Sequence, residues 1–516
     1  MSLNPFRRAS VEYDDTHDIE MLQELGYSQQ LTRRFGVFSN FAVSFSSISI
    51  LTGCVTSYLI AMNAGGPVAI SIGWPLVGVF VVCVALAMAE VCSVYPTAAG
   101  LYFWAGRLAR KNHRQWAWTV GWFNFLGEVA VTAAVDYGAA VTWMALLNLV
   151  VGTPVTPLGT FVAFVVIILI HAVLNAFNVN LVHMLSSVSA WWHLAGAAII
   201  VAALIVLPHH HQSAGWVFTH VENNTGWHSG IYVFLIGLLM AQYTLTGFDA
   251  SAHVAEETRN ASTTAPQGMI RSVVVSIVAG WILLLAVTFA IQSWVGARDS
   301  SIGLPPAQIF IDATGHGMGV VLLLIAAVAQ FFCGMACVTA SSRMAFAFSR
   351  DNALPGSRLW SKVNQKREVP TNSIWLVVAV AVVLASPALF NTTAYLAVTS
   401  IAVIGLYIAY VIPVYLRLRN PEFVQGRWNL GRFSKPIGWI SVIWVAFIVV
   451  LFMLPPSSPI TINSFNYAPI AVLLVIVLAV GTWFASGRRR FMQSDTDAVF
   501  ATAAPTIDDR DLDAIG

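Results

Sequence analysis

The chain has 516 residues, of which 57% are hydrophobic and only 10% are charged, and its formal net charge is +2. Soluble domains average about 25% charged residues, so this composition excludes an ordinary water-soluble protein. The nearly balanced charge implies no nucleic-acid partner.

Apolar runs of about 20 residues recur along the chain, each long enough to cross the hydrocarbon core of a bilayer. Lipid offers no partners to backbone amides, so these runs are expected to be helices. We predict an all-α polytopic membrane protein. Its roughly twelve spans lie near residues 37–62, 67–93, 116–149, 158–178, 184–207, 230–254, 270–294, 318–347, 371–390, 393–416, 437–454 and 466–486.

The basic residues predict the orientation of these spans. If both termini face the cytoplasm, all 26 Lys and Arg residues except Arg298 fall on the cytoplasmic side, as the positive-inside rule requires. We therefore predict a multi-pass protein of the cytoplasmic (plasma) membrane. Its N-terminal segment 1–36 and C-terminal tail 487–516 are cytoplasmic, and its loop 208–229 is extracellular. Ile19–Leu25 is expected to form a short amphipathic helix on the membrane surface.

Two spans carry a glycine flanked by hydroxyl residues, a pattern that can release backbone groups from a membrane helix. The first span contains it around Gly53, and the sixth contains it at Thr244–Asp249. Their separation by five spans fits an inverted five-plus-five repeat over 37–207 and 230–416, with two further helices in 417–486. The alternative is that these glycines serve only helix packing.

A broken first helix offers a site for a zwitterion. The amides of Gly53, Cys54 and Val55 would attract a carboxylate, and the carbonyls of Ser49 and Ile50 would attract an ammonium group. The candidate substrate-binding residues are Ser49, Ile50, Thr52, Gly53, Cys54, Val55, Asp136, Tyr243, Thr244, Gly247 and Phe248.

Acidic residues inside spans are costly and indicate function. Asp249 follows the proposed sixth-helix break, where it could carry a proton, face an ammonium group, or cap the next helical turn. Glu128 and Asp136 share one face of the third span. We expect Glu128 to join an internal hydrogen-bond network and Asp136 to face the substrate or a proton. Glu90 is expected to tie the second span to the basic loop that follows it.

The histidine and cysteine residues indicate function less clearly than the acidic residues do. His193 is the only histidine deep in the fifth span, where it can serve packing or proton transfer. All five cysteines fall within spans, so no disulfide framework is expected. The run His209–His211 lacks a defined ligand spacing, and we predict no metal site.

Five segments in chain order resemble the amino acid–polyamine–organocation superfamily, in its amino acid/choline (γ-aminobutyrate permease-like) branch. They are Leu25–Tyr27 with Leu31–Ala42, Ala87–Gly106, Gly121–Asn124, Thr246–Thr258 and Ser342–Pro355.

The resemblance implies a LeuT-type bundle in which unwound parts of helices one and six, with helices three and eight, hold the substrate. Asp249 looks like the family's acidic residue after the helix-six break, which in some relatives takes part in proton coupling. His193 occupies the place where several relatives carry a lysine that substitutes for sodium. This favours proton coupling, with sodium as the alternative. Glu90 and Tyr95 would belong to a cytoplasmic gate or its structural support.

The sequence thus predicts a secondary active transporter that imports a small amino acid or amine, with γ-aminobutyrate as the leading substrate. We expect no cofactor, and no enzyme activity, because nucleophile elbows and phosphate-binding loops are missing from the sequence. The alternatives are a choline or polyamine carrier and a non-transporting nutrient sensor. The cation carrier would use Trp191, Trp192, Tyr243 and Phe248 for cation–π contacts.

Overall fold

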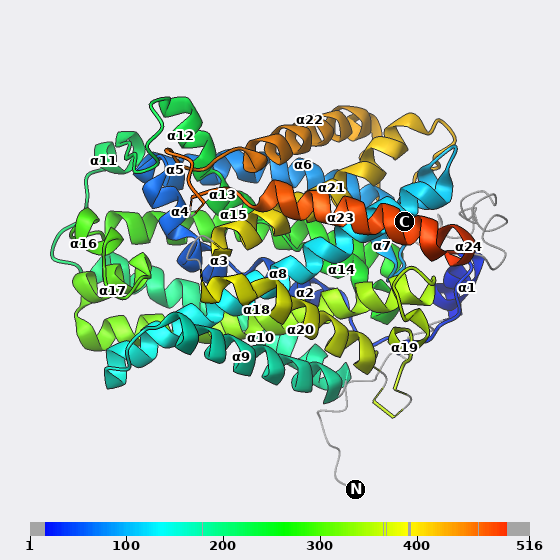
Figure 1. Cartoon of the computed structure of the whole chain (residues 1–516), viewed down its shortest axis with the longest axis horizontal. Coiled ribbons are helices and arrows are strands. Elements are labelled where there is room, and N and C mark those ends of the chain that lie inside the picture. Colours follow the sequence, from blue (N-terminus) through cyan, green and yellow to red (C-terminus); the bar gives the residue numbers. More distant parts are fainter. Residues whose placement is uncertain are drawn as a thin grey trace, which may run out of the picture.

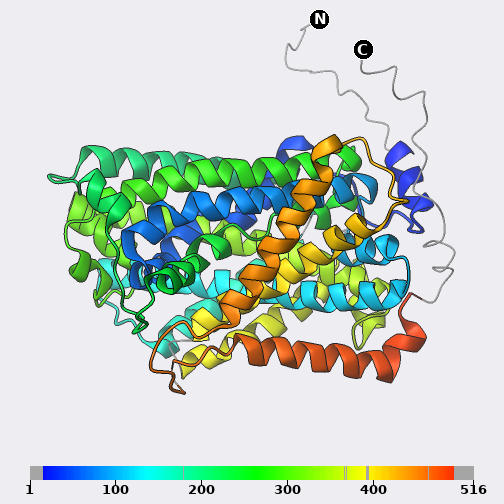
Figure 2. The same cartoon turned by 90° about the horizontal axis from the view of Figure 1, so that it is seen from above.

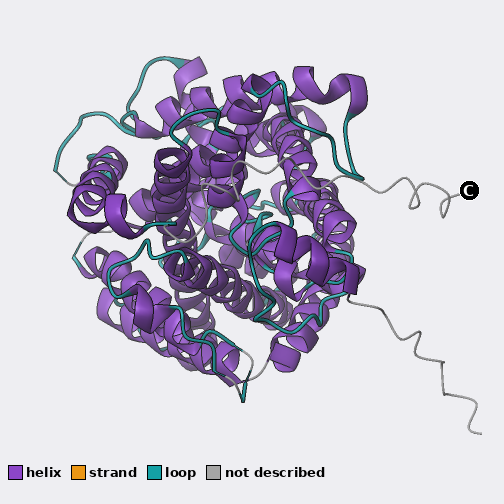
Figure 3. Cartoon of the chain, turned by 90° about the vertical axis from the view of Figure 1, so that its right-hand side faces the viewer, coloured by secondary structure: helices purple, strands orange, loops and turns teal. Residues whose placement is uncertain are grey.

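The computed structural model describes residues 16–177, 179–364, 366–367, 369–390, 394–462 and 464–492. Within these ranges the chain forms helices and no strand, which confirms the predicted all-α class. Figure 3 looks along the resulting bundle, with the helices seen nearly end-on. The predicted terminal segments fall partly outside the described residues, and Arg7, Arg8 and Arg510 lie there.

Eleven helical segments of the described chain are long and apolar enough to cross a membrane. They are α2–α3 (Val37–Ile48 and Ile50–Thr56), α5–α6 (Gly66–Ser71 and Gly73–Val94), α8 (His113–Val151), α9 (Pro157–Phe177), α10 (Val179–Val206), α15 (Ala261–Phe289), α18 (His316–Arg350), α20 with η2 (Thr371–Ala385 and Ser386–Leu389), α21 (Ala394–Arg419), η3 with α22 (Gly431–Phe433 and Ser434–Met453), and α23 with η4 and α24 (Ala468–Thr482, Trp483–Gly487 and Arg488–Arg490).

The remaining predicted span, 230–254, is divided into short helices. These are α12 (Gly230–Gly237), α13 (Leu239–Thr244) and α14 (Ala250–His253), followed by η1 (Ala255–Glu257). Counted with this segment, the chain crosses the bundle twelve times. An even number of crossings places α1 (Thr16–Glu24) and α24 at the same end, as Figure 1 shows.

The two ends of the bundle carry different short helices (Figure 1). The end with α1, α7 (Gly100–Leu108), α19 (Ser357–Trp360) and α24 is called the basic end. The opposite end carries α4 (Tyr58–Asn63), α11 (Ala214–Thr219), α16 (Trp294–Arg298) and α17 (Pro305–Thr314). Arg298, the one cation predicted to face the other side, lies in α16 at this opposite end.

Burial separates inner spans from outer ones. In the most apolar stretch of α2–α3, 83% of residues are buried, against 17% in the α23–α24 segment. Figure 2 shows α22 and α23 on the outside of the bundle. Helix α8 packs against both α18 and α21 in the interior. The broken helices therefore lie inside the protein, where other helices can satisfy their backbone groups.

Candidate functional site

The first span breaks at Ser49, whose backbone is left-handed with φ of 38° and ψ of 89°. Helix α2 ends at Ile48 and α3 begins at Ile50. The Ser49 Oγ atom accepts a hydrogen bond from the Thr52 amide at 3.2 Å and so caps α3. The predicted interruption of this helix is confirmed.

The register predicted for this break is wrong. The Gly53 amide is not free, because it donates to the Ser49 carbonyl at 3.0 Å. Cys54 and Val55 follow within α3, so helix geometry leaves Ile50 and Leu51 as the first amides of the outer half. Gly53 instead permits a close helix contact: a Cβ there would lie 2.6 Å from Thr244 Cβ.

The sixth span breaks between Thr244 and Ala250, as predicted, with Gly247 at φ of +89°. Side chains from other helices satisfy its exposed backbone. Tyr407 donates to the Leu245 carbonyl at 2.8 Å, and Ser44 donates to the Phe248 carbonyl at 2.7 Å. Helices α21 and α2 therefore fix the conformation of this break.

A small cavity of about 10 Å³ lies between the two breaks. Its lining residues are Ser47, Ile48, Thr52, Gly53, Val131, Val135, Tyr243, Thr244, Thr246 and Cys333. Thr52, Gly53, Tyr243 and Thr244 were predicted for substrate binding; the other predicted residues do not line the cavity. A space of this size holds about one water molecule, so the site is contracted in this conformation.

A wider vestibule of about 440 Å³ lies between the two helix breaks and the opposite end of the bundle. It is lined by Thr56 and Asn63 from α3 and α4, by Tyr395 from α21, and by loop residues such as Asn224 and Ser457. Thr56 lies one turn beyond Thr52, which lines the small cavity. The first span thus leads from the vestibule to the cavity.

Asp249 forms a fully buried cluster with His253 and Glu128. Its carboxylate accepts a hydrogen bond from the Tyr410 hydroxyl at 2.5 Å, and its other oxygen lies 3.3 Å from His253 Nε2. Glu128 Oε1 lies 4.0 Å from the same nitrogen. The Asp249 side chain makes no capping bond to α14, so that prediction is wrong.

His253 has partners for two protonation states. Its Nδ1 atom lies 3.2 Å from the Ala98 carbonyl, an acceptor that requires a proton on Nδ1. Its Nε2 atom can accept from the Asn124 amide at 3.3 Å, or carry a proton toward Asp249. Sequence reasoning missed His253, although its i+4 spacing from Asp249 places both on one helical face.

The donor atoms of Glu128, Asp249 and His253 lie within 4.8 Å of one another. Two carboxylates and an imidazole can share protons or hold a small cation. Glu128 also accepts from the Ser341 hydroxyl at 2.9 Å, so the predicted internal network around Glu128 is present.

Asp136 occupies a different environment from the one predicted. Its Oδ1 atom lies 2.9 Å from His171 Nδ1, and both side chains are fully buried. Gly334 packs against this pair, since a Cβ there would lie 2.7 Å from the His171 ring. Asp136 therefore faces α9 and α18, and its neighbours Val131 and Val135 line the cavity.

The aromatic set expected for a cation carrier does not assemble. Trp191 is 64% exposed and Trp192 37% exposed, both on the outer surface of α10. Phe248 packs against Tyr410, with ring centroids 4.9 Å apart. Of the four aromatic residues, only Tyr243 lines the cavity.

Acidic and basic residues of two segments pair at the basic end. Glu257 binds Arg343 at 2.9 Å, and Glu256 binds Arg350 at 2.9 Å. The adjacent Asp351 accepts from the hydroxyls of Tyr27 and Tyr102, each at 2.9 Å. We call Glu256, Glu257, Arg343, Arg350 and Asp351 the basic-end network.

Four of the five sequence segments that carry the resemblance meet at this network. The Ala98 amide donates to Glu256 at 3.1 Å, and Arg33 donates to the Ala255 carbonyl at 3.2 Å. Helix α1 does not lie on the membrane surface as predicted. Its Leu22 is buried, and its Asp18 accepts from the amides of Asn260 and Ala261 at the start of α15.

Glu90 has a structural partner other than the predicted one. Its carboxylate binds Arg417 of α21 at 2.5 Å and the Ser434 hydroxyl at 2.6 Å. It therefore joins α6 to α21 and α22, and the loop after α6 is not its partner. Tyr95 lies beneath the Arg107 guanidinium, 5.5 Å from ring centroid to Cζ. Its place in a gate stays a prediction.

Comparisons with known proteins agree with this architecture. The sequence model of a family described as Amino acid permease matches residues 35–478. The chain is 42% identical to the amino-acid permease BAT1 homolog of Oryza sativa subsp. japonica over 489 residues, 91% of this chain and 94% of the relative. It is 42% identical to amino-acid permease BAT1 of Arabidopsis thaliana, covering 91% and 95%. It is 26% identical to amino-acid permease 2 of Neurospora crassa, covering 93% and 90%.

Proposed function

The chain belongs to the amino acid permease family, and we propose that it is a proton-coupled secondary transporter that imports a small zwitterionic amino acid. The observation that carries this proposal is the meeting of two broken helices around a cavity whose lining contains no charged side chain. Such a site balances a carboxylate and an ammonium group with helix ends and hydroxyls.

The lining supports a small substrate without a charged side chain. Val131, Val135 and Ile48 supply apolar surface, and Thr52, Thr244 and Thr246 supply hydroxyls. γ-Aminobutyrate remains the first substrate to test, because its two ends carry opposite charges and no third group needs a partner. Small neutral α-amino acids form the comparison set.

Access to this site is proposed to alternate between the two ends. The vestibule gives an approach from the opposite end, while the paired charges of the basic-end network close the other side. The distribution of Lys and Arg supports a cytoplasmic basic end with both termini inside the cell. The conformation is then outward-facing with a contracted site, and import requires the network to open.

Asp249 and His253 are proposed to carry the coupled proton. A proton on Nε2 of His253 would replace the Asn124 contact by a charged contact with Asp249. Asp249 directly precedes α14 at the sixth-helix break, so a change in its partner acts on the break itself. Binding of a proton can thereby favour one conformation over the other.

The test uses full-length protein in proteoliposomes. We expect γ-aminobutyrate or a small neutral amino acid to accumulate when the outside is acidic, without added sodium. Asp249→Asn is expected to abolish accumulation but retain substrate exchange between the two sides. Asp312→Asn, an exposed site in α17, is the matched control.

Each alternative predicts a different result in this assay. Undiminished uptake after collapse of the pH gradient, with sodium required, would reject proton coupling. Competition by choline or polyamines but not by amino acids would reject the zwitterion site. Ligand binding without any uptake would indicate a sensor.

A further inference from the structure

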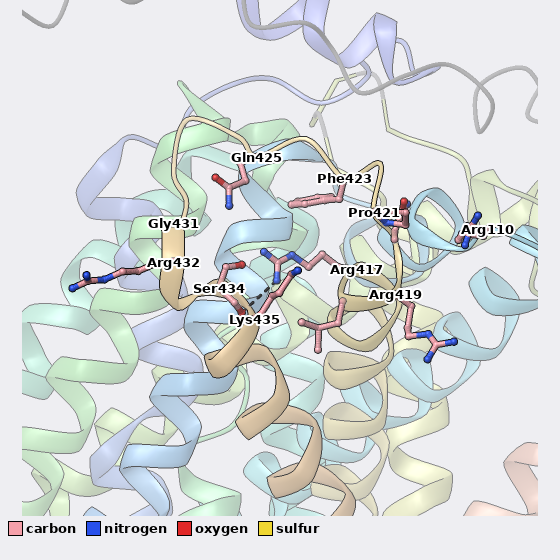
Figure 4. Close-up of a pocket in the computed structure, with 12 residues that line it drawn as sticks. Arg110, Arg417, Arg419, Pro421, Phe423, Gln425, Gly431, Arg432, Ser434 and Lys435 are labelled. Carbon is pink, nitrogen blue, oxygen red and sulfur yellow. Dashed lines mark hydrogen bonds between the residues drawn. The ribbon is translucent and has the colours of Figure 1, made fainter.

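A cavity of about 730 Å³ opens at the basic end, between the end of α21 and the start of α22 (Figure 4). Its lining contains the cations Arg110, Arg417, Arg419, Arg432 and Lys435. In Figure 4, Arg417 and Lys435 converge beside Ser434 at its centre, whereas Arg432 points away. Three sections of chain, the α7–α8 turn, α21 and α22, bring these cations together.

The cavity carries an excess of positive charge. Arg417 is compensated, because it binds Glu90 at 2.5 Å. Arg110, Arg419, Arg432 and Lys435 form no ion pair with any carboxylate in the described part of the chain, and all four are exposed. Glu422, in the loop between α21 and η3, is not among the lining residues.

A second hollow continues the first along the surface. It is about 500 Å³ in volume and shares Arg110 and Arg419 with the larger cavity. Lys111 and Asn112 add a cation and an amide to its lining, and Trp116 adds an indole. The shared residues make one continuous basic groove around the end of α21.

Apolar surface continues directly from the groove toward the middle of the bundle. On α22, Trp439 is 43% exposed, Ile440 is 40% exposed and Ile443 is 67% exposed. Trp439 meets Tyr415 of α21 edge to face, with ring centroids 6.3 Å apart. Exposed aromatic rings at a helix end are typical of the membrane–water interface, and the aliphatic residues beyond them face lipid tails.

We propose that this groove binds the phosphodiester headgroup of an anionic phospholipid, with its acyl chains along α22. The phosphate would lie beside Lys435, within the uncompensated positive charge of Arg110 and Arg419, and basic pockets at helix ends bind such headgroups through charge and hydrogen bonding. The aliphatic stripe below the cations distinguishes a lipid from a soluble phosphate ion. The inference does not depend on which amino acid is transported.

The test measures lipid retained by full-length protein in detergent, by native mass spectrometry, after incubation with phosphatidylglycerol or phosphatidylcholine. The variant is Arg110→Gln/Arg419→Gln/Lys435→Gln. Three cations contribute about 1 kcal/mol each, so phosphatidylglycerol binding is expected to fall roughly 100-fold, with phosphatidylcholine binding unchanged. Arg358→Gln/Lys362→Gln/Lys366→Gln is the matched control, because these exposed cations lie in the α18–α20 connection.

Three results would overturn the proposal. Equal loss in the control variant would indicate a general effect of charge at this end. Unchanged phosphatidylglycerol binding in the groove variant would place the lipid elsewhere. Displacement of phosphatidylglycerol by excess inorganic phosphate, with equal thermal stabilisation of the protein by phosphate alone, would show a soluble-anion site. Selective loss in the groove variant, with unchanged unfolding temperature, supports the lipid site.

Discussion

The Nε2 atom of His193 lies 2.6 Å from the Oγ atom of Ser49, so the fifth span holds the residue at which the first span breaks. The other ring nitrogen, Nδ1, lies 2.7 Å from the Ser189 carbonyl and must carry a proton to make that contact. His193 therefore presents Nε2 as an acceptor to the Ser49 hydroxyl. The left-handed backbone of Ser49 is stabilised by this bond.

We expect His193→Ala to lower the rate of substrate uptake by roughly tenfold or more. Loss of the ring leaves the Ser49 hydroxyl without this partner in a buried position, at a cost of about 1–3 kcal/mol. The measurement is initial uptake rate in proteoliposomes, normalised to the amount of folded protein. His183→Ala, on the same helix and half-buried, is the control. Equal losses in both variants would contradict a specific role for the Ser49 contact.

Gly53→Ala is expected to abolish uptake. The new Cβ would lie 2.6 Å from Thr244 Cβ, so the two broken helices must separate where they line the cavity. Overpacking of this kind costs typically about 1–3 kcal/mol and displaces backbone. Uptake and unfolding temperature should both fall. Gly481→Ala in α23 provides the control, since a Cβ there meets no atom within 4 Å. Normal uptake by the Gly53 variant would rule out this close contact.

Glu257→Gln is expected to lower the unfolding temperature in detergent strongly. Arg343 is fully buried, and removing the charge of its partner leaves an uncompensated guanidinium, which costs about 3–5 kcal/mol. In the Arg298–Asp299 pair at the opposite end, the Asp299 side chain is exposed. Asp299→Asn should therefore change the unfolding temperature little. If the two variants lose the same stability, the basic-end network does not hold the bundle closed.

Asp351 gives the protein a pH-dependent stability. Burial raises the pKa of its carboxyl group, an effect that Arg350 and the hydroxyls of Tyr27 and Tyr102 oppose. Between the unfolded-state pKa, about 4, and this raised value, the folded state binds more protons than the unfolded state. This contribution to stability is complete below the lower pKa and is lost as the pH rises through the higher one.

Replacement by asparagine tests this sign. The unfolding temperature of the natural protein minus that of Asp351→Asn should fall as the pH rises from 4 to 7, because the natural protein loses stability when this carboxyl group ionises. Asp312→Asn, on the surface of α17, serves as the control for a carboxylate in water. If the unfolding temperature of the natural protein rises with pH relative to that of Asp351→Asn, the folded state favours the ionised carboxylate.

Several parts of the site were predictable from local sequence. Glycine beside hydroxyl residues marked both interrupted spans. A helix can break inside a membrane when small residues release the backbone and nearby hydroxyl groups form hydrogen bonds to the released backbone groups. Asp249 stood out as a charge inside a span. Its partner His253 did not, because the i+4 spacing shows only that the two side chains can share a helical face and not that they meet. Asp136 was wrongly assigned to the cavity because its partner, His171, lies on another helix and is not evident from the residues around Asp136.

The sequence by itself determined the membrane class, the orientation pattern of the basic residues, the two broken spans and the family. These properties follow from hydropathy, residue size and charge counted along the chain. Only the tertiary structure decided that the first break lies at Ser49, because His193 supplies its partner from the fifth span. It also decided that Glu256 and Glu257 meet Arg350 and Arg343. A freed backbone group or a buried charge is stabilised by a partner on a distant helix. Which partner comes close enough depends on how the helices pack, and the order of residues along the chain does not show this.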